Sequence, residues 1–142
     1  MKLSSLEAIV HALDGASVRF IVVGGLAVAA HGYGRFTQDV DLVIPLDRVT
    51  IRKLFGALHA LGYSPRLPIT YEMFGDPDQR ARWIEEKGMT VLNFHSDMHR
   101  ETPIDIFVTE PFDFEAEYAR AMVEAIGGSA SLRIVALPTL LK

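Results

Sequence analysis

The chain has 142 residues, of which 49% are hydrophobic, and a formal net charge of −4 at pH 7. This length and apolar content favour one globular domain over residues 1–142 and exclude a largely disordered chain. The negative net charge argues against non-specific coating of nucleic acid. A local basic patch, at Arg48, Arg52 and Lys53 or at Arg80 and Arg82, could still meet a polyanion. Without cysteine, any metal ion must be held by oxygen or imidazole. The sequence has no apolar run of membrane-spanning length, so we expect a cytoplasmic protein without a membrane partner.

The first half of the sequence alternates predicted helices and strands. Helices are expected where apolar residues recur every 3.6 positions, and strands where short apolar runs lie between glycine and proline. These signals predict, in chain order, a helix from Ser4 or Ser5 to Gly15, a strand at 18–23, a short helix at 26–30, a strand at 39–44 and a helix capped by Asp47 and ending at Gly62.

The second half begins with a less regular stretch at 63–88, which contains three prolines and is interpreted as a variable insertion. The remaining signals predict a short helix at 78–87, strands at 89–95 and 103–109, a helix at 114–126, a strand at 132–135 and a helix that Pro138 opens and the chain end cuts off.

Two carboxylates stand one residue apart in the strand expected at 39–44. Side chains at positions i and i+2 of a strand share a face, so Asp39 and Asp41 would lie side by side. Aspartate is depleted in strands and adjacent anions repel, which a bound divalent cation would offset most simply. Asp105 occupies an equivalent polar position in the strand at 103–109. If the two strands are neighbours, three carboxylates converge on one face of the sheet and can hold two Mg²⁺ ions.

The glycine pair Gly24-Gly25 lies between an expected strand and an expected helix. Glycine has no Cβ, so backbone N–H groups at such a helix start can approach a phosphate group closely. The sequence therefore predicts a phosphate-binding turn a short distance before the two acids.

The ordered set of residues from this turn to the acids resembles a known superfamily. It comprises Gly24-Gly25, Ala27, His31-Gly32, Arg35, Thr37, Asp39, Asp41 and Leu42. The set resembles the nucleotidyltransferase superfamily of the DNA polymerase β type, in its minimal bacterial branch that includes AbiEii-like toxin nucleotidyltransferases. The resemblance covers residues 18–44 and extends to Asp105 as the expected third acid.

The resemblance implies an α/β (α+β) fold with a mixed β-sheet and helices packed on one side. It also implies Mg²⁺-dependent transfer of a nucleoside monophosphate from an NTP to an RNA, such as tRNA, or to a protein acceptor, with Mn²⁺ as an alternative ion. Asp39, Asp41 and Asp105 would be catalytic residues and metal ligands, and Asp105 also the base for the acceptor. Gly24, Gly25, Arg35, Thr37 and Lys142 would bind nucleotide or phosphate. A toxin-antitoxin or defence role, with an antitoxin partner, is the expected setting.

Several alternatives stay open at this point. A catalytically silent nucleotide-binding or regulatory module of the same fold would keep the motif without turnover, and a structural Mg²⁺ site would need no nucleotide. Arg35 can touch a phosphate or neutralise Asp39 or Asp41 directly. We interpret His31 as a helix-terminal residue and the sequence around His95 and His99 as a polar loop rather than a metal site.

Overall fold

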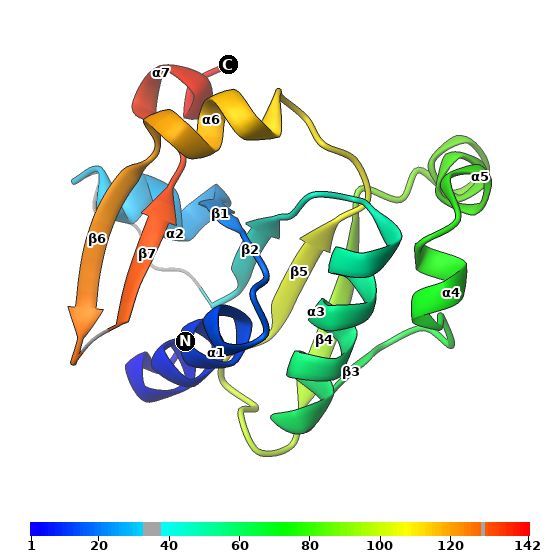
Figure 1. Cartoon of the computed structure of the whole chain (residues 1–142), viewed down its shortest axis with the longest axis horizontal. Coiled ribbons are helices and arrows are strands. Elements are labelled where there is room, and N and C mark those ends of the chain that lie inside the picture. Colours follow the sequence, from blue (N-terminus) through cyan, green and yellow to red (C-terminus); the bar gives the residue numbers. More distant parts are fainter. Residues whose placement is uncertain (33–37, 129) are drawn as a thin grey trace.

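The computed structural model describes residues 1–32, 38–128 and 130–142 (Figure 1). The strands of this part of the chain are β1 (Ile21–Val23), β2 (Val40–Val43), β3 (Tyr63–Pro65), β4 (Val91–Ser96), β5 (Ile104–Phe107), β6 (Met122–Gly127) and β7 (Ala130–Ile134). Its helices are α1 (Leu3–Gly15), α2 (Gly24–Ala30), α3 (Arg48–Ala60), α4 (Tyr71–Phe74), α5 (Pro77–Lys87), α6 (Phe114–Arg120) and α7 (Leu137–Leu140).

The described strands form one mixed sheet in the order β3-β4-β5-β2-β1-β7-β6. At its centre, β2 runs antiparallel to β1 and parallel to β5, while β1 runs parallel to β7. The outer pairs β3–β4, β4–β5 and β6–β7 are antiparallel. The expected α+β class with a mixed sheet and packed helices is therefore confirmed.

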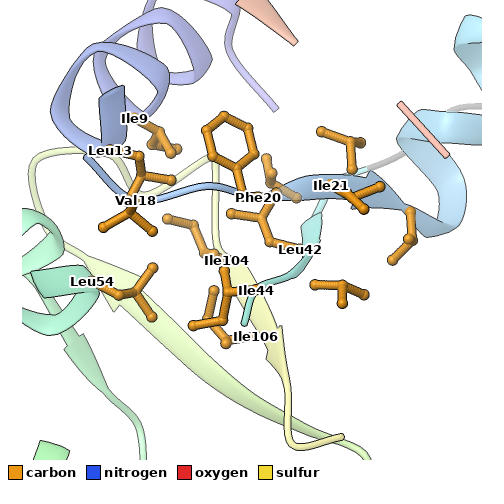
Figure 2. Close-up of a cluster of buried hydrophobic side chains, with 14 of the residues drawn as sticks. Ile9, Leu13, Val18, Phe20, Ile21, Leu42, Ile44, Leu54, Ile104 and Ile106 are labelled. Carbon is orange, nitrogen blue, oxygen red and sulfur yellow. The ribbon is translucent and has the colours of Figure 1, made fainter. Parts of the chain in front are cut away.

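The hydrophobic core lies between the sheet and the two longest helices, α1 and α3. Leu42, Ile104 and Ile106 point from the sheet toward these helices and are at most 1% exposed. Figure 2 shows Ile9 and Leu13 of α1 and Leu54 of α3 in the same cluster. Because side chains alternate along a strand, Asp41 and Asp105 are placed on the opposite face of the sheet.

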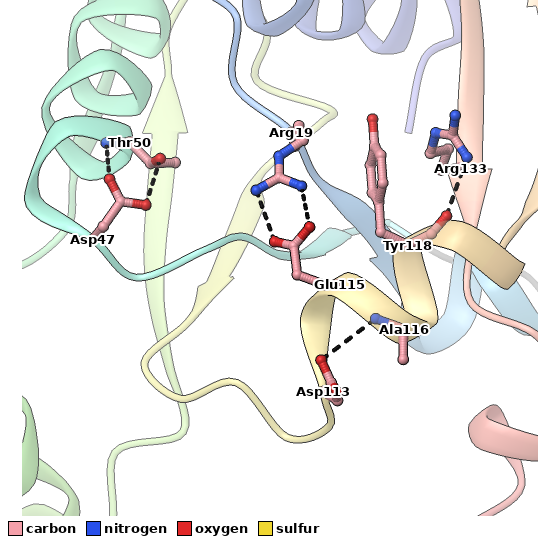
Figure 3. Close-up of polar contacts among 8 residues, drawn as sticks. All are labelled: Arg19, Asp47, Thr50, Asp113, Glu115, Ala116, Tyr118 and Arg133. Carbon is pink, nitrogen blue, oxygen red and sulfur yellow. Dashed lines mark hydrogen bonds and ion pairs between the residues drawn. The ribbon is translucent and has the colours of Figure 1, made fainter.

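The sequence predicted N-terminal capping residues for α1 and α3, and the structure confirms the one for α3 only. Asp47 caps α3 as expected, since its Oδ1 accepts a hydrogen bond from the Thr50 amide at 2.8 Å (Figure 3). The predicted serine cap of α1 is wrong, because the helix begins at Leu3. Ser5 is buried in its first turn, where its hydroxyl is 2.7 Å from His99 Nδ1.

The predicted helix at 114–126 is also only partly correct. Helix α6 ends at Arg120, and the backbone of Ala121 is extended with φ −63° and ψ 147°. The chain then continues as β6, which pairs with β7 along almost its whole length. Methionine, glutamate and alanine in β6 are acceptable helix formers, so only the pairing with β7 makes this segment a strand.

The irregular stretch at 63–88 contains more structure than its sequence indicates. It holds the edge strand β3 and the short helix α4, which the sequence did not predict, as well as the predicted helix α5. Nowhere in the described ranges is a helix both long enough and apolar enough to cross a membrane.

Candidate active site

Asp41 and Asp105 lie directly beside each other on neighbouring strands. The parallel register of β2 and β5 pairs these two residues, and both side chains are half-buried. On the other side of β5, Asp105 is paired with Asn93 of β4. Directly paired residues point to the same face, so these three side chains form a row across the sheet.

Asp39 joins this row from the segment just before β2. The next residue, Val40, anchors that segment to the start of β5 through a hydrogen bond from its amide to the Pro103 carbonyl at 2.9 Å. The side chains of both Asp39 and Asp41 hydrogen-bond to Asp105. Asp39, Asp41 and Asp105 therefore meet as predicted, and we call them the acid cluster.

Two residues of the acid cluster, Asp41 and Asp39, have raised pKa values. Burial raises the pKa of Asp41 to about 7, and the charge of Asp105, the hydrogen bond to it and the charge of Asp39 act in the same direction. Burial is also the main reason that the pKa of Asp39 is raised, followed by the charge of Asp105 and the hydrogen bond to it. A hydrogen bond between two carboxyl groups needs a proton, so these bonds add to the effect of burial on the pKa values of Asp41 and Asp39.

The glycine pair lies against Asp41. A Cβ on Gly24 would overlap Asp41 Oδ2, and the φ of +68° at this residue also favours glycine. The Gly25 backbone N–H donates a hydrogen bond to the Asp41 carboxyl group and lowers its pKa, although burial and the neighbouring acids outweigh this effect. The glycine turn therefore contacts Asp41, and its binding of a phosphate group stays a prediction.

A cleft of about 570 Å³ adjoins the acid cluster at Gly24. Its lining comes from β1, the start of α2, β5, the segment around α6, and α7 with the residues after it. It includes Val23, Gly24, Phe107, Phe112, Thr139 and Lys142. Phe107 shares a face of β5 with Asp105, two residues away, so the cleft and the acids lie on the same side of the sheet. A cleft of this size suits a small organic ligand.

Two of the polar groups around the cleft have a structural role. Glu117 of α6 accepts a hydrogen bond from the Thr139 hydroxyl of α7 at 2.6 Å and forms an ion pair with Arg120. Asp113 caps α6 through the Ala116 amide (Figure 3). Lys142 is the basic residue in the described lining of the cleft.

Sequence reasoning missed Asn93 and Arg66. Asn93 Nδ2 donates a hydrogen bond to Asp105 Oδ1 at 2.6 Å, and Arg66 Nε donates one to Asn93 Oδ1 at 2.5 Å. The positive charge of Arg66 also lowers the pKa of Asp39, against the larger effects of burial and Asp105. The polar position of Asn93 within a predicted strand was the one available signal, but its partner depends on strand pairing.

The remaining predicted residues have varied outcomes. Arg35 and Thr37 lie outside the described residues. His31 Nε2 donates to the Val135 carbonyl at 2.8 Å, which joins the end of α2 to the chain after β7. His99 stacks on Tyr63 and contacts Ser5, so it packs against α1 and β3 as an ordinary structural residue.

The chemistry of the acid cluster fits a divalent cation, since three carboxylates offer the hard oxygen donors that Mg²⁺ and Mn²⁺ prefer. Within the described ranges, no group of three or more acidic or histidine side chains has the arrangement of a formed metal site. In this arrangement Asp39 and Asp41 each hydrogen-bond to Asp105. A bound cation would take over the role of the shared protons in offsetting the repulsion between them.

Comparisons with known proteins add no assignment. Neither the protein-family models nor the curated proteins compared with this chain give a match. The resemblance to nucleotidyltransferases therefore stays a prediction from the motif residues.

Proposed function

We propose that the protein is an Mg²⁺-dependent nucleotidyltransferase that moves an NMP from an NTP to an RNA, such as tRNA, or to a protein acceptor. The observation that carries the proposal is the position of Gly24, which lies against Asp41 and also lines the cleft. A ligand in the cleft would therefore have its phosphates close to the acid cluster. The raised pKa values of Asp39 and Asp41 are typical of functional carboxylates.

Each part of the site has a role in this proposal. Asp39, Asp41 and Asp105 would hold two Mg²⁺ ions, which supply Lewis-acid stabilisation of a triphosphate when bound. Phe107 and Phe112 would contact the apolar face of the nucleoside, and Lys142 would bind phosphate oxygens. Arg35 and Thr37 are assigned to phosphate binding by the motif resemblance alone.

The proposed reaction needs one proton acceptor. Asp105 takes the proton from the acceptor hydroxyl, whose oxygen forms a bond to the α-phosphorus of the NTP. The bond from that phosphorus to the oxygen bridging the α- and β-phosphates breaks, and pyrophosphate leaves. We place this activity in the cytoplasm, within a toxin-antitoxin or defence system in which an antitoxin partner controls it.

The direct test is label transfer from each α-³²P-labelled NTP to cell RNA or cell protein in the presence of Mg²⁺. Asp39→Ala, Asp41→Ala and Asp105→Ala should each lower transfer, with Asp105→Ala losing about 10²- to 10⁴-fold as a general base does. Asp97→Ala is the matched control, because Asp97 is an exposed aspartate outside the cluster. Equal transfer by the parent and all three cluster variants would overturn the assignment.

Calorimetry separates an active enzyme from a silent module. Tight binding of Mg²⁺-NTP by the parent without any label transfer would favour the catalytically silent alternative. An Mg²⁺-dependent gain in stability that NTP does not change would favour a structural metal site.

A further inference from the structure

Arg66, Asn93 and Asp105 form a hydrogen-bonded chain that ends on the acid cluster. Asn93 of β4 is paired with Asp105 of β5, and the Arg66 amide donates to the Asn93 carbonyl at 2.9 Å just beyond the end of β3. The side-chain bonds follow the same path, at 2.5 Å from Arg66 to Asn93 and 2.6 Å from Asn93 to Asp105. Residues of β4 and of the segment just after β3 thus support one carboxyl group on β5.

These hydrogen bonds determine which way the side-chain amide of Asn93 points. An arginine side chain can only donate hydrogen bonds, so the Asn93 oxygen must face Arg66. The Asn93 NH₂ group is then directed at Asp105, where it donates to Oδ1. Without Arg66, only the repulsion between the Asn93 oxygen and the Asp105 carboxylate would oppose rotation of the amide by half a turn.

We propose that Asn93 and Arg66 are positioning residues for Asp105, a role that rests on the proposed function. Asn93 holds Oδ1 of Asp105 and so determines the rotation of the carboxyl group, while Arg66 holds Asn93 in the donating orientation. Along the row of side chains this support comes from the β4 end, whereas Gly24 lies at the other end, beyond β2 and next to β1. Neither residue lines the cleft, so both should affect the chemical step more than nucleotide binding.

Kinetics provide the first measurement. Asn93→Ala should lower kcat by about 10- to 100-fold, as is typical when an outer hydrogen-bond partner of a ligand is lost, with KM for the NTP unchanged. Arg66→Met should lower kcat by a smaller factor, and Arg66→Lys, which can still donate to Asn93, should restore much of it. The matched controls are His95→Ala, at the next position on the same face of β4, and Arg82→Met, an exposed arginine of α5.

Two further measurements do not need activity. In NMR spectra of the parent, the Asn93 side-chain NH₂ should give separated, slowly exchanging signals that move toward ordinary values in Arg66→Met and Asp105→Ala but not in Arg82→Met. Mn²⁺ titration should show weaker binding in Asn93→Ala by about 10- to 100-fold. Arg66 is exposed, so its variants should fold even if Asn93→Ala does not.

The outcomes distinguish this inference from the proposed function. An active parent whose kcat changes less than twofold in both Asn93→Ala and Arg66→Met would overturn the positioning role and leave the activity standing. A loss confined to KM would overturn it as well. If the parent transfers no label, the proposed function fails, and the positioning role then fails too unless Asn93→Ala weakens Mn²⁺ binding.

Discussion

Gly24 lies directly against the carboxyl group of Asp41, so position 24 cannot carry a side chain while Asp41 keeps its place. An ideal Cβ there would overlap Oδ2 and lie 2.9 Å from Cγ of Asp41. This contact joins the turn before α2 to the acid cluster on β2. It means that the glycine of the motif is required by packing against the acid, whatever ligand the cleft accepts.

Gly24→Ala should therefore destabilise the protein through two effects. The positive φ alone costs about 1–2 kcal/mol for a residue with a Cβ, and the overlap with Asp41 adds about 1–3 kcal/mol. Gly88→Ala is the matched control, because Gly88 has a φ of +62° and open space around it. The measurement is urea unfolding of both variants.

A double mutant isolates the contact itself. In an Asp41→Ala background, Gly24→Ala should lose much of its extra cost, because the overlapping carboxyl oxygen is gone. Strictly additive losses would show that Gly24 and Asp41 do not interact as described.

Asp41→Asn should stabilise the metal-free protein at pH 8. Since the pKa of Asp41 is raised from 3.8 to about 7 by folding, the folded state binds its proton more tightly than the unfolded state. The contribution of this group to stability is therefore largest below pH 3.8, falls as pH rises to about 7 and is constant above that. The asparagine variant avoids this loss, so its gain should be clear at pH 8 and small at pH 4. Thermal melts in EDTA at both pH values measure this gain in stability, with Asp97→Asn as the exposed control. An equal gain at pH 8 and pH 4 would contradict the prediction.

Mg²⁺ should raise the melting temperature of the parent. A ligand that binds only the folded state at 100 times its Kd adds about 2.7 kcal/mol, which corresponds to a shift of several degrees for a chain of this size. Asp39→Ala or Asp41→Ala should abolish the shift, because each removes a carboxylate from the cluster. Asp97→Ala should keep it. Sodium chloride at matched ionic strength controls for screening, and a shift that survives both cluster variants would place the ion elsewhere.

Asp47→Ala should destabilise the protein by about 0.5–2 kcal/mol at pH 7, the usual cost of losing an N-cap. Asp47 accepts hydrogen bonds from both the amide and the hydroxyl of Thr50, and these bonds lower its pKa. Its stabilising effect should therefore decline as pH falls through the folded pKa, opposite in sign to Asp41. Chemical unfolding at pH 7 and pH 3 tests this, and a larger loss at pH 3 would contradict it.

Much of the site could be predicted because its signals are local. The alternation of a strand places Asp39 and Asp41 on one side, and the break after β1 requires glycine at a sharp turn. Even so, Asp39 precedes β2 rather than lying in it. The helical prediction for 114–126 was correct only as far as Arg120, because β6 becomes a strand through its pairing with β7.

The sequence by itself determined that Asp39 and Asp41 share a face and that a glycine turn precedes them, since both follow from backbone geometry over a few residues. Only the tertiary structure decided that β5 pairs in parallel with β2, which brings Asp105 opposite Asp41. The antiparallel pairing of β4 with β5 brings Asn93 to Asp105, and the edge strand β3 brings Arg66 to Asn93. Strand order and register arise from burial of the apolar face against α1 and α3, a property of the whole chain that no local pattern contains.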